Sequence, residues 1–169
     1  MRRAGFTIIE LLVAFTIGMM LIIGGTMAAN SFNARQKVDA AVDQITEVVS
    51  LAKNYAMTRQ KPTSSYTRAI EYVVVIIDAT GNIYVYPGNN SQRRDTVSYL
   101  HRNINPSEVT VTGVADGGLI FSVPEGKLVD YREDTTIPHS SSDVTITVAL
   151  AGDPTNSKII TIEPSGLIR

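Results

Sequence analysis

The sequence predicts an α+β fold in which one long N-terminal helix packs on an antiparallel β-sheet head. Three patterns lead to this prediction. The chain carries no charge between Glu10 and Arg35, and apolar residues then recur at helical spacing as far as Ala56. From Tyr72 onward, short β-branched and aromatic runs alternate with Gly, Pro and Asn turns. A length of 169 residues suits one apolar helix and one globular domain of common size.

The apolar run after Glu10 is long enough to cross a membrane. A helix of about 24 residues, at about 1.5 Å of rise per residue, covers roughly 36 Å, whereas a hydrocarbon core is about 30 Å thick. The run is too long for the apolar part of an ordinary secretory signal, and Met27–Asn30 is a weak cleavage sequence of that kind. Arg2 and Arg3 precede the run and predict a cytoplasmic N-terminus, with the head outside the cytoplasm. We therefore expect a transmembrane helix over residues 6–29.

Glu10 is the one charged residue at the start of this apolar segment. An isolated carboxylate in lipid either takes up a proton or finds a cation. An ionisable residue in a membrane span is by default a candidate functional residue. The alternative is an ordinary signal anchor in which Glu10 reaches the membrane surface.

Residues 30–61 are predicted to continue the helix as an amphipathic segment that packs on the head. Pro62 disfavours helical geometry at the residue before it, so the helix is expected to run from about Phe6 to Gln60. Apolar positions recur at steps of three and four residues, as they do on one buried helix face. These positions are Val38, Ala41, Val42, Ile45, Val48, Val49, Ala52, Tyr55 and Ala56.

Residues 62–169 are predicted to form a β-rich globular head without a second long helix. A hairpin turn is expected at Ala79–Asn82, where Gly81 and Asn82 both tolerate positive φ. Two further turns are expected at Pro124–Lys127 and Gly152–Asn156. The predicted strands are Tyr72–Ile77, Ile83–Tyr86, Thr96–Leu100, Glu108–Thr112, Leu119–Val123, Leu128–Tyr131, Val144–Leu150, Lys158–Ile162 and Leu167–Arg169.

Composition and motifs favour neither an enzyme nor a cofactor. A net charge of −1 without a Lys/Arg-rich stretch argues against direct nucleic-acid binding, and the absence of Cys excludes disulfides and Cys-ligated metals. The chain has no nucleophile elbow, phosphate-binding loop or dinucleotide motif. His101 and His139 lack metal-ligand spacing, and acidic turn residues such as Asp153 lack the spacing of a calcium loop. We therefore predict no catalytic, cofactor-binding or metal-binding residues.

The N-terminal residues resemble the signature of type IV pilins and type II secretion pseudopilins. In that family a short basic leader ends in Gly, an aromatic residue follows, and a Glu is the fifth residue of the mature chain. Here Gly5 precedes Phe6, and Glu10 is the fifth residue counted from Phe6. The resemblance implies a leader peptide of residues 1–5, cleavage between Gly5 and Phe6 by a prepilin peptidase, and N-methylation of Phe6. The chain departs from many major pilins because it has no Cys to close a C-terminal loop.

Cleavage after Gly5 would create a cation for Glu10, namely the new ammonium group on Phe6. That ammonium could belong to the same chain or to a neighbouring subunit. If it belongs to a neighbour, each subunit offers one carboxylate and one amine, and head-to-tail contacts that do not close into a ring produce a helical filament. Phe6 and Glu10 are therefore the predicted assembly residues.

Three further stretches resemble, more loosely, the H-type minor pseudopilins and related minor pilins. The first is a strand and hairpin that contains Phe and Gly, at Leu119–Gly126. The second is the closing strand, Gly turn and short last strand at Ile159–Ile168. The third is the helical stretch Leu51–Arg59, in which Lys53 stands where Arg is usual.

These observations predict a structural subunit of a type IV pilus-like or type II secretion pseudopilus filament, most simply a minor pilin or pseudopilin. The expected partners are prepilin peptidase, other pilin or pseudopilin subunits through the N-terminal helix, and an inner-membrane assembly platform. The subunit would start as a single-pass protein of the cytoplasmic membrane and then join a filament in the periplasm or at the cell surface. Two alternatives stay open: the major subunit of such a filament, or a signal-anchored protein with a ligand-binding β-rich domain.

Overall fold

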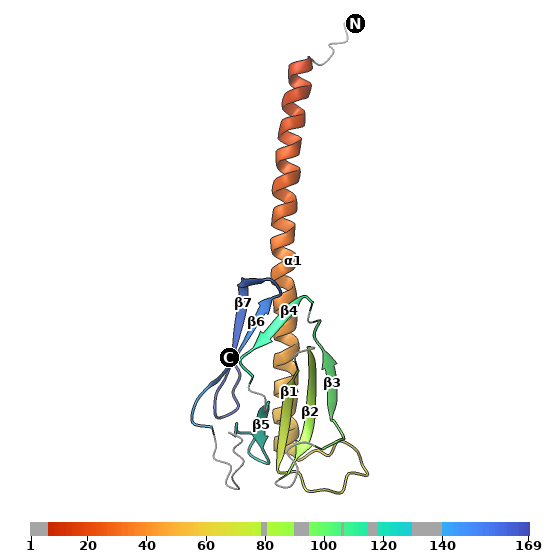
Figure 1. Ribbon diagram of the computed structural model, residues 1–169, viewed down its shortest axis with the longest axis vertical. Coiled ribbons are helices and arrows are strands. Elements are labelled where there is room, and N and C mark those ends of the chain that lie inside the picture. Colours follow the sequence, from red (N-terminus) through yellow and green to blue (C-terminus); the bar gives the residue numbers. More distant parts are fainter. Residues whose placement is uncertain (1–6, 79–80, 90–94, 106, 115–117, 130–139) are drawn as a thin grey trace. The chain divides into compact units, whose positions relative to one another are not determined.

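The structure is a computed structural model of the whole chain, and it describes residues 7–78, 81–89, 95–105, 107–114, 118–129 and 140–169. One helix, α1 (Ile8–Thr58), is followed by strands β1 (Tyr72–Ile77), β2 (Asn82–Gly88), β3 (Leu100–Asn103), β4 (Val109–Thr112), β5 (Leu119–Ser122), β6 (Val144–Leu150) and β7 (Asp153–Ile162) (Figure 1). The chain forms two compact units, Met1–Gln36 and Lys37–Arg169, here called the N-terminal unit and the globular unit. The predicted α+β class, a long N-terminal helix with antiparallel sheets, is confirmed.

The strands form two antiparallel sheets in the globular unit. A four-stranded sheet has the order β3-β2-β1-β5, and a three-stranded sheet has the order β4-β6-β7. The expected hairpin joins β1 and β2, which pair from Tyr72↔Gly88 to Ile77↔Ile83, and Gly81 in its turn has a φ of 76°. The short last strand exists as a single bridge, Ile162↔Ile168.

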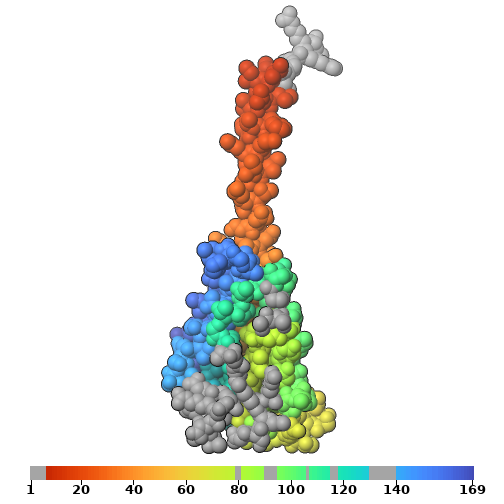
Figure 2. All heavy atoms as spheres, viewed as in Figure 1, coloured from red at the N-terminus to blue at the C-terminus, as the bar shows by residue number. Residues whose placement is uncertain are grey.

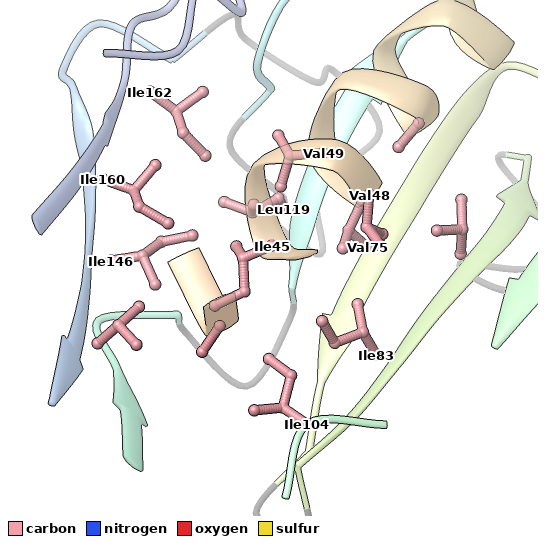
Figure 3. Close-up of a cluster of buried hydrophobic side chains, with 14 of the residues drawn as sticks. Ile45, Val48, Val49, Val75, Ile83, Ile104, Leu119, Ile146, Ile160 and Ile162 are labelled. Carbon is pink, nitrogen blue, oxygen red and sulfur yellow. The ribbon is translucent and has the colours of Figure 1, made fainter. Parts of the chain in front are cut away.

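The core lies where α1 meets both sheets (Figure 3). Seven of the nine apolar helix positions predicted from periodicity are buried, and the other two, Val42 and Tyr55, pack against the core while partly exposed. Ile45, Val48 and Val49 lie between residues of the four-stranded sheet, such as Val75, and residues of the three-stranded sheet, such as Ile160. The 3.6-residue period therefore identified the packing face of the second half of the helix.

Strand β1 is buried on both faces. Val73 and Val75 face the main core, whereas Tyr72 and Val74 pack with Ile120 and Val129 in a second cluster. A strand that is covered on both sides does not need polar residues at alternate positions. This explains why Tyr72–Ile77 is a continuous apolar run rather than an alternating one.

One strand and one turn were predicted in the wrong position. Thr96–Leu100 was predicted as a strand, but β3 begins only at Leu100. The carboxylate of Asp95 accepts hydrogen bonds from the backbone N–H of Thr96 at 2.6 Å and from its hydroxyl at 3.2 Å, and such local bonds compete with a strand ladder. Gly152–Asn156 was predicted as a turn, but β7 already begins at Asp153, and a register shift at Ala149/Leu150 accommodates the tighter connection.

The helix ends two residues earlier than predicted. The Gln60 N–H donates to the Tyr55 carbonyl oxygen at 3.2 Å, and the Arg59 N–H donates to the Ala56 carbonyl oxygen at 3.4 Å. This pair of bonds is the Schellman arrangement that ends many helices, and its left-handed position usually holds Gly. Here Arg59 takes that position, with a φ of 52°. The end of α1 therefore depends on a left-handed backbone at Arg59, a residue type that disfavours this conformation.

Arg59→Gly is expected to stabilise the globular unit by about 0.5–1 kcal/mol, because Gly adopts a left-handed backbone without the steric cost that a side chain adds. Thermal unfolding of the full-length protein in detergent micelles, followed by circular dichroism, would show a rise in Tm of a few degrees. Gln60→Gly lies one residue further on, where no positive φ is found, and serves as the control that should not stabilise. A lower Tm for Arg59→Gly would contradict the proposed steric cost of the left-handed backbone at Arg59.

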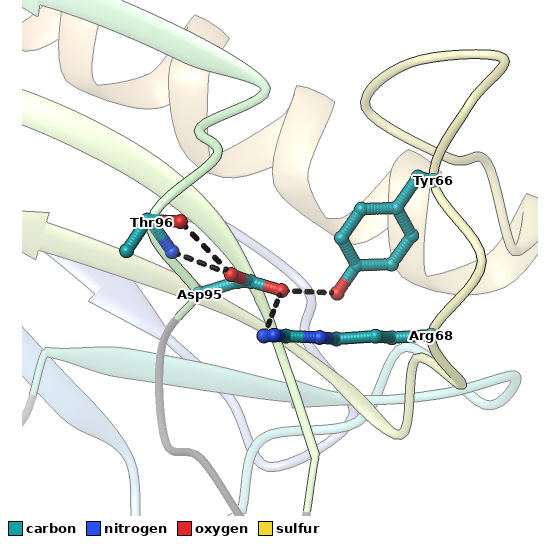
Figure 4. A network of polar contacts seen from close by, with 4 residues as sticks. All are labelled: Tyr66, Arg68, Asp95 and Thr96. Atoms are coloured by element: carbon teal, nitrogen blue, oxygen red, sulfur yellow. Dashed lines mark hydrogen bonds and ion pairs between the residues drawn. The ribbon is translucent and has the colours of Figure 1, made fainter.

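A buried carboxylate holds the segment after the helix (Figure 4). Asp95 is 8% exposed and accepts hydrogen bonds from the Tyr66 hydroxyl at 2.9 Å and from Nη1 of Arg68 at 3.0 Å. Burial alone would raise the pKa of Asp95, but the bonds from Thr96 and Tyr66 and the charge of Arg68 together hold this pKa below its ordinary value. Burial and the bond to Asp95 raise the pKa of Tyr66 to about 12, so this hydroxyl stays a donor at neutral pH.

Acid is expected to weaken this attachment. Because the pKa of Asp95 is lower in the folded state than in the unfolded chain, its stabilising contribution is present above the unfolded value of about 4 and is lost as the pH falls through the folded value. Asp95→Asn should therefore lower Tm at pH 7, and the difference from wild type should shrink steadily below about pH 4. Circular dichroism melts from about pH 7 to about pH 2.5 measure this. Asp43→Asn removes an exposed helix carboxylate and is the matched control; a pH-independent difference for Asp95→Asn would contradict the prediction.

Candidate assembly helix

The first turn of α1 contains a reciprocal capping arrangement. Thr7 precedes the helix, and its hydroxyl oxygen accepts a hydrogen bond from the Glu10 N–H at 3.3 Å. In return, the Glu10 carboxylate accepts bonds from the Thr7 N–H at 2.9 Å and from the Thr7 hydroxyl at 3.0 Å, all to Oε2. This is a capping box, which satisfies two backbone donors that a helix start otherwise leaves unpaired. The Thr-x-x-Glu spacing is the signal in the sequence that could have revealed it, in addition to the spacing from Phe6.

Glu10 therefore has a local structural role beside the predicted assembly role. The capping bonds use one carboxylate oxygen, Oε2, and no hydrogen bond to Oε1 is found among the described residues. Both roles are thus geometrically compatible. Gly5 and Phe6, the predicted processing residues, lie outside the described residues.

The surface of α1 in the N-terminal unit is apolar and uncovered. Its large side chains are 51% to 83% exposed, with Ile8 the most exposed, and Figure 2 shows this segment in red and orange. Among the described residues, one helix, α1, is long and apolar enough to cross a membrane by length and composition. Its most apolar window has a mean hydropathy of 2.3 and none of it is buried. Apolar surface on this scale needs lipid or other protein to cover it.

Polar side chains within the apolar segment are satisfied by the helix itself. The Thr16 hydroxyl donates to the Val13 carbonyl oxygen at 2.8 Å, and the Thr26 hydroxyl donates to the Ile23 carbonyl oxygen at 2.9 Å. In a medium without water, such groups must find partners inside the protein. The segment therefore presents no hydroxyl that requires solvent at these two positions.

The three stretches of the looser resemblance meet at one side chain, Lys53. Its ammonium donates to the carbonyl oxygens of Ser165 at 3.3 Å and Gly166 at 2.9 Å. A Cβ on Gly166 would lie 3.3 Å from the Lys53 stem and 2.4 Å from the backbone oxygen of Gly126. A Cβ on Gly126 would lie 3.2 Å from the same stem and 2.8 Å from Met57. We call Lys53, Gly126 and Gly166 the lysine clamp; it ties the C-terminal turn and the β5 hairpin to the helix.

The histidine and acidic residues considered as metal ligands make ordinary structural contacts or lie outside the described residues. The His101 ring stacks on Tyr84 with centroids 4.6 Å apart, and its Nε2 lies 3.1 Å from Oδ1 of Asn82. No group of three or more His, Cys, Asp and Glu side chains that could hold a metal ion lies in the described part of the chain. Asp153, the first residue of β7, accepts hydrogen bonds from Thr155 and Asn156, and these bonds lower its pKa. His139 lies outside the described residues.

The fold and the helix together define a class: a protein with a β-rich globular unit and an exposed apolar N-terminal helix of membrane-spanning length. Residues 1–26 match the family model described as the prokaryotic N-terminal methylation motif. A search of curated protein sequences finds no relative. Among solved structures, the fold is similar to that of the type IV minor pilin FimU of Pseudomonas aeruginosa strain PAO1, with a TM-score of 0.57 and 12% sequence identity over 82% of this chain and 90% of that one.

Residues 1–26 thus carry the methylation motif, and the chain has a fold like that of a type IV minor pilin. The apolar helix and the motif indicate membrane anchoring.

Proposed function

We propose that this chain is a minor subunit of a type IV pilus-like or pseudopilus filament, made as a membrane-inserted precursor and assembled through its N-terminal helix. The observation that carries the proposal is the methylation motif at residues 1–26, which includes the first part of α1, where the apolar side chains are uncovered. The similarity to a minor pilin favours a minor over a major subunit. The globular unit then lies outside the cytoplasm, as Arg2 and Arg3 favour.

Processing is the first step of the proposed pathway. Prepilin peptidase cleaves between Gly5 and Phe6, and Phe6 is then methylated on its new amino terminus. Cleavage removes Arg2 and Arg3 and places an ammonium group four residues before Glu10. In lipid, this ammonium on one subunit and the Glu10 carboxylate on the next neutralise each other, which selects the register between neighbouring helices.

Assembly is the second step. The apolar side chains from Ile8 to Phe32 exchange lipid contacts for contacts with other pilin subunits. Because lipid is as apolar as these side chains, close packing rather than the hydrophobic effect drives this exchange. An ion pair in the same setting therefore adds specificity that packing alone lacks.

Intact mass and N-terminal sequencing, with protein from cells that contain or lack a prepilin peptidase, test the processing step. A mature chain that begins at Phe6 and carries one added methyl group, only when the peptidase is present, is the expected result. A chain that still begins at Met1, or that is cut elsewhere, would indicate that the N-terminus is an ordinary signal anchor. Subunit counting in purified filaments then separates a minor subunit, present in a few copies, from a major one.

A further inference from the structure

The segment between the helix end and β1 borders a groove of about 520 Å³ in the globular unit. This volume falls within the range of roughly 300–1,000 Å³ that is typical of ligand pockets. One part of the lining is apolar and consists of Ala69, Ile70 and Val123, and the rest is polar or charged. The charged lining residues are Arg59, Lys61, Arg68 and Glu71.

Two of the three cations in the groove are available to a ligand. For the exposed side chains of Arg59 and Lys61, the described part of the chain provides no hydrogen bond or ion pair. Arg68 is already used, because its guanidinium pairs with Asp95. Glu71 adds one carboxylate to the lining. Among the described residues that line the groove, three cationic side chains therefore stand against one carboxylate, beside an apolar surface.

The groove is held in shape by contacts from outside its lining. Asp95 holds Tyr66 and Arg68, as described above, and the Tyr99 hydroxyl donates to the Gln60 carbonyl oxygen at 2.6 Å. Tyr99 in turn stacks on Tyr55 of the helix, with ring centroids 4.6 Å apart. Gln60 lies between the two available cations in the chain, so this bond anchors the backbone that carries both. A preorganised backbone lowers the conformational entropy lost on binding.

The left-handed backbone of Arg59 is a second sign of a site. A non-Gly residue in this conformation costs of order 1 kcal/mol, and such residues cluster at binding sites. Gly is the ordinary choice at this helix-terminating position and would end the helix equally well. Arg59 instead of Gly lowers stability and adds a cationic side chain to the lining of the groove.

We propose that this groove binds an acidic peptide segment of a partner protein, with a carboxylate beside Arg59 and Lys61 and an apolar side chain against Ile70 and Val123. A peptide fits the mixed lining because it offers carboxylates to the cations and side chains to the apolar wall. A nucleic acid fits poorly, since Glu71 repels its phosphates.

The positive charge of the groove is a local feature of the globular unit. The chain as a whole has a net charge of −1, and three of its cations, Arg2, Arg3 and Arg35, belong to the N-terminal unit, which leaves the globular unit net acidic. An acidic partner is therefore attracted to the groove rather than to the globular unit in general.

The test uses the full-length chain in uncharged detergent micelles and a labelled tetrapeptide of alternating Glu and Leu, with the Gln–Leu peptide as its uncharged counterpart. Fluorescence anisotropy is expected to show at least about tenfold tighter binding of the acidic peptide, weakening with added salt. Arg59→Gln and Lys61→Gln should each weaken binding about three- to fivefold, and the double variant about tenfold. Arg102→Gln with Lys158→Gln removes two other surface cations, each paired with a helix carboxylate, and should leave binding unchanged.

Arg59→Gly separates binding from folding, because it should stabilise the protein while it weakens the peptide complex. Equal affinity for both peptides, or equal losses in the control double variant, would overturn the proposal. Full competition by oligothymidylate would show that the groove binds polyanions in general rather than an acidic peptide. Self-association of the chain that disappears in the Arg59→Gln, Lys61→Gln variant would instead make a second copy the occupant. Each of these results is independent of processing at Gly5, so the groove and the filament proposals fail separately.

Discussion

Glu10→Ala is expected to abolish incorporation of the chain into filaments while leaving its insertion into the membrane intact. In the proposed contact, the carboxylate of one subunit faces the Phe6 ammonium of the next inside an apolar helix bundle. Loss of one partner of a desolvated ion pair costs about 3–5 kcal/mol, so incorporation should fall by more than about a hundredfold. The filament fraction, compared with the membrane fraction by immunoblotting, measures both quantities.

The capping box requires two further variants, because Glu10→Ala also removes the bonds to Thr7. Glu10→Gln keeps an oxygen that can accept these bonds but removes the charge, and it should fail to assemble like Glu10→Ala. Thr7→Ala removes the hydroxyl from the cap, at a cost of about 1 kcal/mol to the first helical turn, but keeps the carboxylate, so it should still assemble. Assembly of Glu10→Gln at the normal level, or failure of Thr7→Ala alone, would assign the role of Glu10 to helix capping rather than to the ion pair.

Gly166→Ala is expected to destabilise the globular unit by about 3 kcal/mol, because the left-handed backbone and a clash with backbone atoms both oppose the substitution. The residue has a φ of 72°, and a Cβ there would lie 2.4 Å from the Gly126 carbonyl oxygen. Relief requires the C-terminal turn to move away from Gly126, which disturbs the lysine clamp. Denaturant unfolding followed by circular dichroism measures the loss in the free energy of unfolding.

Gly152→Ala is the matched control for this prediction. Gly152 has a similar φ of 82°, but nothing lies within 4 Å of the position that a Cβ would take there. Its substitution should therefore cost only the backbone contribution, about 1 kcal/mol. Equal losses in the two variants would show that the close approach at the lysine clamp contributes nothing to stability.

The sequence determined the features that depend on local spacing. The 3.6-residue period from Val38 to Ala56 identified the buried face of α1, because a helix on one side of a core repeats its contacts at that period. The uncharged run before Arg35 identified the segment that is uncovered in the structure, since length and polarity alone decide whether a helix suits lipid. The Gly5-Phe6 and Glu10 spacing pointed to the family, and the assembly roles of these residues remain predictions.

Only the tertiary structure decided the features that depend on residues distant in the chain. Asp95 is an ordinary acidic residue in the sequence, yet it holds Tyr66 and Arg68 and displaces the expected start of β3, because burial makes its hydrogen bonds decisive. Likewise, Lys53, Gly126 and Gly166 lie far apart in sequence and meet only when the C-terminal turn reaches the helix. Local propensity depends on neighbouring residues, whereas these contacts depend on the tertiary fold. The spacing of residues in the sequence therefore does not predict them.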